Sequence, residues 1–267
     1  MSTTNSRMSR KRFSEPLLGI GGILLFLLVW EAVPRLGLVS ARFLPPASTV
    51  LVQLVNYLGQ ASFWGDVGQT MFSWALGLVI SIVAAVVLGL FIGSSRFLGR
   101  ATHSTIEFLR PIPSVALIPL AVLLFGIKME SSLLLVIYAS FWQVLLQVLY
   151  GVQDVDPVAD NTAKSYGLGR IARVRYVVWP TVLPYLMTGV RLASAVALIL
   201  AITAELVIGS PGLGKQIGLT QSGGAVPEMY ALIVATGVIG VLINVGVRIV
   251  ERRVLTWHPS VRGEGIA

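Results

Sequence analysis

Long runs without charged residues constrain this chain more than any other feature. Charges are absent at 16–30, 67–95, 111–127, 131–152 and 229–247, and the run at 182–208 contains only Arg191 and Glu205. Each run is near the ~20 residues that a helix needs to cross a bilayer. The pattern predicts an all-α integral membrane protein with about six transmembrane helices.

Composition supports the same class. Of the 267 residues, 55% are hydrophobic and only 12% are charged, against about 25% charged in a typical soluble domain. The first run follows the basic residues Arg10–Arg12, so a signal peptide is an alternative. No small-residue cleavage site follows, and we therefore predict a retained helix. The chain has no cysteine, which excludes disulfides and thiolate metal sites.

The basic residues are divided unequally between the two sides of the predicted membrane. Fifteen Lys and Arg residues lie in the N-terminal arm, at 96–110, at 154–181 and near the C-terminus, whereas the alternate connections hold four. The positive-inside rule then places both termini in the cytoplasm of a multi-pass protein of the plasma or inner membrane. The net charge of +8 is thereby explained without a nucleic-acid partner.

The segment "GSPGLGKQ", residues 209–216, matches a phosphate-binding loop up to Gln216, where Ser or Thr would hold magnesium. It follows an apolar helix instead of a strand, and it falls on the predicted outer side. We interpret it as a tight, irregular turn at the end of the fifth span. Any nucleotide would then be bound by another chain.

The predicted cytoplasmic loop at 154–181 is the longest polar connection between spans. Asp156 followed by Pro157 predicts a helix start, and Gly167 permits a left-handed exit after residues 157–166. Residues 170–178 can form a second short basic helix that Pro180 would end. This compact unit suits docking to a soluble partner, although a solvated basic connector is an equal alternative on physical grounds.

Residues 161–180, "NTAKSYGLGRIARVRYVVWP", resemble the EAA loop of ABC importer permeases. The motif positions are occupied by Asn161, Thr162, Ala163, Gly167, Val177, Trp179 and Pro180. Four of these differ from the pattern: Asn161 stands for glutamate, Thr162 for alanine, Val177 for isoleucine and Trp179 for leucine. "FLPPASTV" at 43–50, the segments 110–127 and 166–184, and "SPGLG" after the fifth span are similar to the nitrate/sulfonate/taurine group of these permeases. The likeness covers about residues 43–255.

This resemblance implies a type I ABC importer permease fold. The transmembrane domain would cover 43–255 with a coupling loop at 154–180, preceded by a cytoplasmic arm at 1–15 and by the first helix and start of the outer loop at 16–42. A cytoplasmic tail would follow at 256–267. The implied contacts with the ATPase are Asn161, Thr162, Ala163, Tyr166, Gly167 and Pro180.

The resemblance also implies partners and cargo. Two permease copies, a homodimer, would pair with two cytoplasmic ABC ATPase subunits and an extracytoplasmic solute-binding protein. The solute would be a small anion such as a sulfonate, taurine or nitrate, with other solutes, including pyrimidines, as the alternative. The chain itself would have no enzyme activity, catalytic residue, cofactor or metal.

The main alternative is a channel or an ion-coupled secondary transporter that uses the two charges within the fifth span. Arg191 and Glu205 are fourteen residues apart, about 40° around a helix and about 21 Å along it. An intramembrane charge is costly and often functional, so we predict that both line the pathway. In the other interpretation Glu205 lies at the outer interface and Arg191 snorkels inward.

An enzyme or a metal protein is a weaker alternative. His103 and His258 are the only histidines, and neither has a plausible set of partners. Asp154, Asp156 and Asp160 cap and solvate a helix start more readily than they hold a metal.

Overall fold

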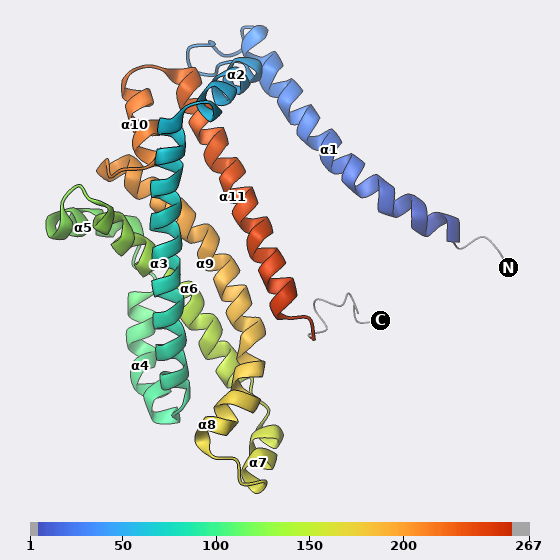
Figure 1. Cartoon of the computed structure of the whole chain (residues 1–267), viewed down its shortest axis with the longest axis vertical. Coiled ribbons are helices and arrows are strands. Elements are labelled where there is room, and N and C mark those ends of the chain that lie inside the picture. Colours follow the sequence, from blue (N-terminus) through green and yellow to red (C-terminus); the bar gives the residue numbers. More distant parts are fainter. Residues whose placement is uncertain (1–4, 258–267) are drawn as a thin grey trace. The chain divides into compact units, whose positions relative to one another are not determined.

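The computed structural model describes residues 5–257, with side chains from residue 18 onward. Every regular element in this part of the chain is helical (Figure 1). Five helices are long and apolar enough to cross a membrane. They are α1 (Asn5–Arg35), α3 (Ala61–Gly93), α6 (Met129–Gln153), α9 (Trp179–Ile208) and α11 (Val226–Val254). These helices confirm five of the predicted spans and the all-α membrane class. The arm at 1–15 and the tail at 256–267 fall mostly outside the described side chains, and their predicted boundaries stay predictions.

The third predicted span, 111–127, is not a single transmembrane helix. It contains a short 3₁₀ turn (Ser114–Leu117) and α5 (Ile118–Phe125), whose eight residues extend only about 12 Å. Residues 96–109, which we expected to be a loop, form α4 (Arg96–Leu109). The two helical segments meet at a bend of 81° and count together as at most one broken span. Pro111 and Pro113 explain the break, because a proline lacks the N–H that a continuous helix needs.

The residue contacts divide the chain into two units. One comprises the chain up to Gln60 together with Leu219–Val234. It contains α1 and α2 (Ala47–Leu58), a short helix that the sequence did not predict. Glu31 fixes the start of α2 by accepting the Ser48 backbone N–H at 2.9 Å and the Ser48 hydroxyl at 2.8 Å. In the same unit, the Tyr230 hydroxyl donates a hydrogen bond of 3.1 Å to the Phe43 carbonyl.

The second unit, Ala61–Gly218 with the chain from Ala235 onward, is built around α3, α6 and α9. Glycines of α3 pack against valines of α6, and the difference between the two residue numbers is the same in each pair. A Cβ added at Gly77 would lie 2.6 Å from Val136, and one at Gly89 would lie 2.6 Å from Val148. Because both numbers rise together, α3 and α6 run parallel, and the chain returns between them through α4 and α5 (Figure 1). Small residues at such contacts let membrane helices approach closely.

Helices α6 and α9 pack antiparallel through a second pair of glycines. A Cβ at Gly151 would lie 2.9 Å from the Val182 Cα, and one at Gly189 would lie 3.2 Å from the Val144 Cα. A larger residue at Gly151 would require the backbone at Val182 to shift, and one at Gly189 would require its neighbours to move by a few tenths of an ångström. This contact fixes α9, which carries Arg191 and Glu205, against the centre of the unit.

Pro180 does not end the second basic helix as the sequence predicted. Residues 170–208 form one continuous helical run, which begins with α8 (Arg170–Arg173) and continues through a π-helical turn (Val174–Val178) into α9. Trp179 donates its N–H to the Val174 carbonyl, five residues back. This wider turn accommodates a proline next to it, because the usual i→i−4 pattern is already interrupted there.

The "GSPGLGKQ" segment is a turn only in its first half. Gly209 ends α9 in a left-handed conformation with φ of 80°, and α10 (Leu213–Ser222) begins four residues later. Gly214 and Lys215 therefore lie in a helix, and the element before the segment is a helix too. This arrangement agrees with the prediction of a turn and lacks the strand that a phosphate-binding loop follows.

Candidate functional site

The loop at 154–180, the predicted coupling loop, begins with the short helix that the sequence predicted. Helix α7 (Pro157–Ser165) starts at Asp156, whose carboxylate accepts the Val158 N–H at 2.8 Å. Proline occupies the first helical position, where its missing N–H costs no hydrogen bond. The helix ends one residue before the predicted boundary. Both features could be predicted from the sequence, because the Asp156 cap and Pro157 each act on residues within one helical turn.

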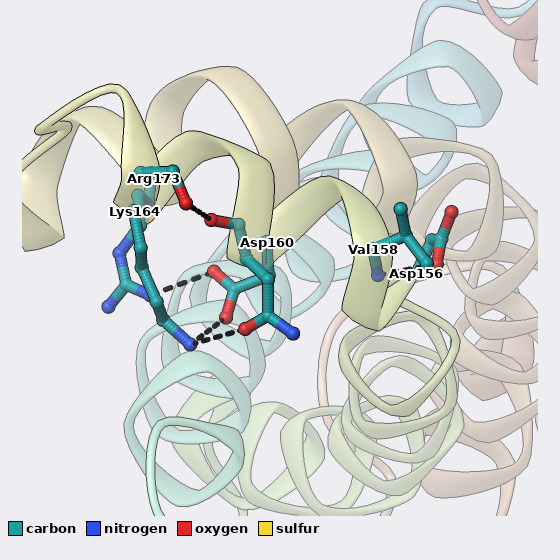
Figure 2. Close-up of polar contacts among 7 residues, drawn as sticks. Asp156, Val158, Asp160, Lys164 and Arg173 are labelled. Atoms are coloured by element: carbon teal, nitrogen blue, oxygen red, sulfur yellow. Dashed lines mark hydrogen bonds and ion pairs between the residues drawn. The ribbon is translucent and has the colours of Figure 1, made fainter.

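Asp160 clamps the two helical segments of this loop together. Its carboxylate lies 2.7 Å from the Lys164 Nζ in the same helix and 2.8 Å from Arg173 Nη1 in α8 (Figure 2). The hydrogen bond from Lys164 holds the pKa of Asp160 below its ordinary value, and the charge of Arg173 adds to this effect. The carboxylate therefore stays ionised and keeps α7 against α8 at neutral pH.

Gly167 adopts the left-handed backbone that we predicted, with φ of +75°. Its N–H bonds the Lys164 carbonyl at 2.9 Å, and the next N–H, that of Leu168, bonds the Ala163 carbonyl at 3.0 Å. These bonds satisfy the last carbonyls of α7. Apart from Gly167 and its two chain neighbours, no atom of the described chain lies within 4 Å of a Cβ built at this position, so the backbone conformation and not crowding favours glycine here.

Large apolar side chains protrude from the coupling loop. Tyr166 is 81% exposed and Ile171 is 86% exposed. Of the other predicted contact residues, Asn161, Thr162 and Pro180 are exposed, whereas Ala163 is buried. Most of the predicted contact residues are therefore accessible on this loop, whereas Ala163 packs in its interior. Exposed apolar side chains on a polar, charge-clamped loop are typical of a protein-binding surface.

Arg191 is not isolated in the span. Its Nη1 lies 3.5 Å from Glu251 Oε2 on α11, and its side chain remains 43% exposed. Glu251 also lines a cavity of about 500 Å³ with Asp154, Pro180 and Tyr185. The ion pair therefore joins the middle of α9 to the end of α11, close to the coupling loop. This partner could not be predicted from the sequence, because two residues sixty positions apart leave no local pattern.

Glu205 lies in a different environment from Arg191. It is 1% exposed, and its Oε2 accepts the Thr70 hydroxyl at 2.8 Å and the Gly214 N–H at 3.0 Å. Oε1 has no hydrogen-bond partner among the described residues. A Cβ at Gly212 would overlap this carboxylate, so the turn wraps closely around it. The structure does not bring the two predicted pathway charges together.

Comparison with known proteins decides the family. A family model described as "Binding-protein-dependent transport system inner membrane component" matches residues 82–256. The chain belongs to this family. It is therefore the multi-pass inner-membrane permease subunit of an ABC importer, and ATP hydrolysis resides in a separate subunit. The predicted family resemblance and the absence of an enzymatic role are confirmed.

Two relatives illustrate the similarity of this permease subunit to known ones. The taurine transport system permease protein TauC of Escherichia coli (strain K12) is 32% identical over 92% of this chain and 91% of its own length. The nitrate import permease protein NrtB of Leptolyngbya laminosa is 25% identical over 73% of this chain and 70% of its own.

Solved structures agree on the fold of the permease. A chain of the inward-facing MetNI methionine ABC transporter has a TM-score of 0.63 and 18% identity, covering 72% of this chain and 96% of that one. A chain of a bacterial ABC transporter that imports the acidic polysaccharide alginate has a TM-score of 0.64 and 14% identity, covering 93% and 99%. The type I importer architecture predicted from sequence is thereby confirmed.

Proposed function

We propose that this permease forms the pathway for a small anion, such as a sulfonate, taurine or nitrate, delivered by a solute-binding protein. The relatives named for taurine and nitrate support this solute class. Family membership favours ATP-driven import over the channel or ion-coupled transporter that the two intramembrane charges first suggested.

The observation that carries the coupling mechanism is the exposed, clamped loop at 154–180. Tyr166 and Ile171 present apolar surface, while Asp160 and Arg173 hold the two segments in one geometry. A surface that transmits force must be rigid as well as accessible. We therefore infer that this loop docks on the ATPase, with Asn161, Thr162, Tyr166, Gly167 and Pro180 near the contact and Ala163 supporting α7 from inside.

Arg191 is the better supported of the two pathway residues. Its guanidinium is partly exposed and only loosely paired at 3.5 Å, so it can exchange Glu251 for a passing anion. Glu205 is buried and already holds Thr70 and Gly214. Its proposed place in the pathway stays a prediction, and its contacts support a second role in which it positions the turn at 209–212.

We further propose that both termini are cytoplasmic and that the permease works as a homodimer. The parallel course of α3 and α6 supports counting α4 and α5 as one crossing, which gives six crossings. The surplus of basic residues at the coupling loop and termini supports the orientation. A coupling loop in the cytoplasm is also where an ATPase could reach it.

Reconstitution tests the proposed function. The permease, its ATPase and its solute-binding protein are placed in vesicles, and uptake of radiolabelled taurine, an alkanesulfonate and nitrate is measured with and without ATP on the ATPase side. We expect ATP-dependent uptake of at least one of these anions. Uptake that continues without the ATPase, or that follows an ion gradient instead of ATP, would favour the channel or secondary-transporter alternative.

The lack of cysteine allows a direct test of orientation. Tyr166→Cys and Lys215→Cys each introduce a single thiol at an exposed position. A membrane-impermeant maleimide should label Tyr166→Cys only from the cytoplasmic side and Lys215→Cys only from the other side. Labelling of both from one side would show that the six-crossing topology is wrong.

A further inference from the structure

Helix α4 carries a basic stripe that is separate from the coupling loop and from Arg191. Arg96, Arg100 and His103 are spaced four and three residues apart, which places them on one face of the helix. Ser104 lies beside them. Within the described residues, neither Arg96 nor Arg100 forms an ion pair. Two unpaired guanidinium groups one turn apart repel each other, and an anion between them would relieve that repulsion.

The stripe forms one wall of a groove. A cavity of about 750 Å³ is lined by Arg96, Arg100, His103 and Ser104 from α4 and by Val152 and Gln153 near the end of α6. A smaller cavity of about 210 Å³ continues along the same face to Arg110. Glu107 is the acidic residue on this stripe, and its Oε2 lies 3.4 Å from His103 Nδ1. The groove is therefore lined by basic side chains at the Arg96 end and by both basic and acidic side chains farther along.

The other faces of α4 show how this helix sits in its surroundings. Ile106 and Leu109 pack against the hydrophobic core. Phe97 and Phe108 are 77% and 73% exposed, and their spacing of eleven residues places them on a common face next to the basic stripe. Basic and bulky apolar side chains on adjoining faces are typical of a helix at a membrane interface.

We propose that this groove binds a phosphate group. Arg96 and Arg100 would hold the phosphate oxygens through paired N–H donors, which match phosphate geometry, and the Ser104 hydroxyl and Gln153 amide would supply further donors. An anionic phospholipid headgroup and free inorganic phosphate share this chemistry. The exposed phenylalanines favour the lipid, because acyl chains could cover them while the headgroup occupies the groove.

The position of the groove links it to the coupling loop. Val155, just before α7, and Pro157, its first residue, line the same cavity. A bound phosphate would therefore contact the base of the loop and restrict its motion. The assignment of this end to the cytoplasm rests on the proposed function, whereas the binding itself does not.

Direct binding measurements test the site without any transport assay. The purified permease complex is titrated with phosphatidylglycerol, and the bound lipid is counted by native mass spectrometry, with phosphatidylcholine as the neutral comparison. A separate calorimetric titration uses inorganic phosphate. Both titrations compare the natural chain with Arg96→Gln/Arg100→Gln. Arg248→Gln removes a charge from an exposed position outside the groove, and Glu107→Gln removes the acidic residue.

Each arginine that contacts the phosphate should strengthen binding by a factor of about five, so the double variant should bind roughly 25-fold more weakly. Arg248→Gln should bind normally, and Glu107→Gln should bind at least as tightly as the natural chain. An arginine-dependent response to phosphatidylglycerol identifies the ligand as a lipid, and one to inorganic phosphate alone identifies a free anion. If neither titration depends on Arg96 and Arg100 in a normally assembled complex, the proposal is wrong.

Discussion

The Thr70 hydroxyl donates a hydrogen bond of 2.8 Å to Glu205 Oε2, across 135 positions of sequence. The same hydroxyl oxygen accepts the Leu213 N–H at 3.0 Å, and the same carboxylate oxygen accepts the Gly214 N–H at 3.0 Å. This network joins α3, α9 and the start of α10 at one buried point. Such networks rigidify their surroundings through their satisfied members, and here the one member without a partner among the described residues is Glu205 Oε1.

Breaking this network should destabilise the second unit. Thr70→Val keeps the side-chain shape but leaves Glu205 and the Leu213 N–H short of a partner, which costs about 1–3 kcal/mol of unfolding free energy. Glu205→Ala should cost a similar amount, and the double variant less than the sum, because the two residues share one bond. Unfolding in detergent measures these losses, with exposed Thr105→Val as the control. Additive losses would contradict a shared network.

None of this network could be read from the sequence. Glu205 stands out in the sequence because it interrupts an apolar run, but Thr70 is an ordinary polar residue in another helix. A hydrogen bond across 135 positions depends on how α3 and α9 pack, and no local periodicity encodes that contact. The start of α7 was predicted correctly for the opposite reason, since Asp156 and Pro157 act within one helical turn.

Gly167 offers a matched test of the coupling loop. Gly167→Val forces a β-branched residue into a backbone with φ of +75°, at a cost of about 1–2 kcal/mol. Gly169→Val is the control, because that glycine has φ of −67° and, within the described chain, an equally open Cβ position. We expect only Gly167→Val to lower ATPase retention or solute uptake per ATP hydrolysed. Equal behaviour of the two variants would leave the loop as a passive connector.

Variants of Arg191 and of its partner Glu251 can distinguish a role in the solute pathway from a purely structural role. If Arg191 guides the anion, Arg191→Leu should reduce uptake several-fold in a normally assembled complex. Glu251→Gln should leave uptake at or above the natural level, since it frees the guanidinium. If the 3.5 Å pair is structural instead, both variants should reduce stability and uptake together. Vesicle uptake and thermal unfolding, measured on the same preparations, distinguish these results.

The clamp at Asp160 should depend on pH. Lys164 and Arg173 lower the pKa of Asp160 from 3.8 in the folded chain, so the ionised form stabilises the loop. This contribution is complete above the ordinary pKa and is lost as the pH falls through the lowered one. Hydrogen exchange of residues 157–173, corrected for its intrinsic pH dependence, should show protection falling in that acid window. Asp160→Asn should be less protected at neutral pH and should show no such fall.

The third predicted span shows where hydrophobicity alone misleads. The run at 111–127 has the composition of a transmembrane helix, yet α5 contains only eight residues. Pro111 and Pro113 prevent a straight helix through this run, and contacts from α6 stabilise the resulting bend. The Tyr138 hydroxyl of α6, for example, donates a hydrogen bond of 2.6 Å to the Leu109 carbonyl at the bend, and the Ser131 hydroxyl bonds the Ala121 carbonyl of α5 at 3.1 Å. The composition of a segment determines whether it prefers lipid or water, whereas the direction of its backbone depends on tertiary contacts of this kind.

The unbroken helical run from Arg170 to Ile208 has a mechanical consequence. Its 39 residues extend about 58 Å, with the Arg173–Asp160 clamp near one end and the buried Glu205 near the other. The close glycine contacts with α6 at Val182 and Gly189 lie between them, so we expect α6 and α9 to tilt together as one lever. In such a lever, a tilt of about 5° about its middle displaces each end by roughly 2–3 Å in opposite directions. Movement imposed on α7 would thereby reach the turn at 209–212 without any chain of rearranged side chains.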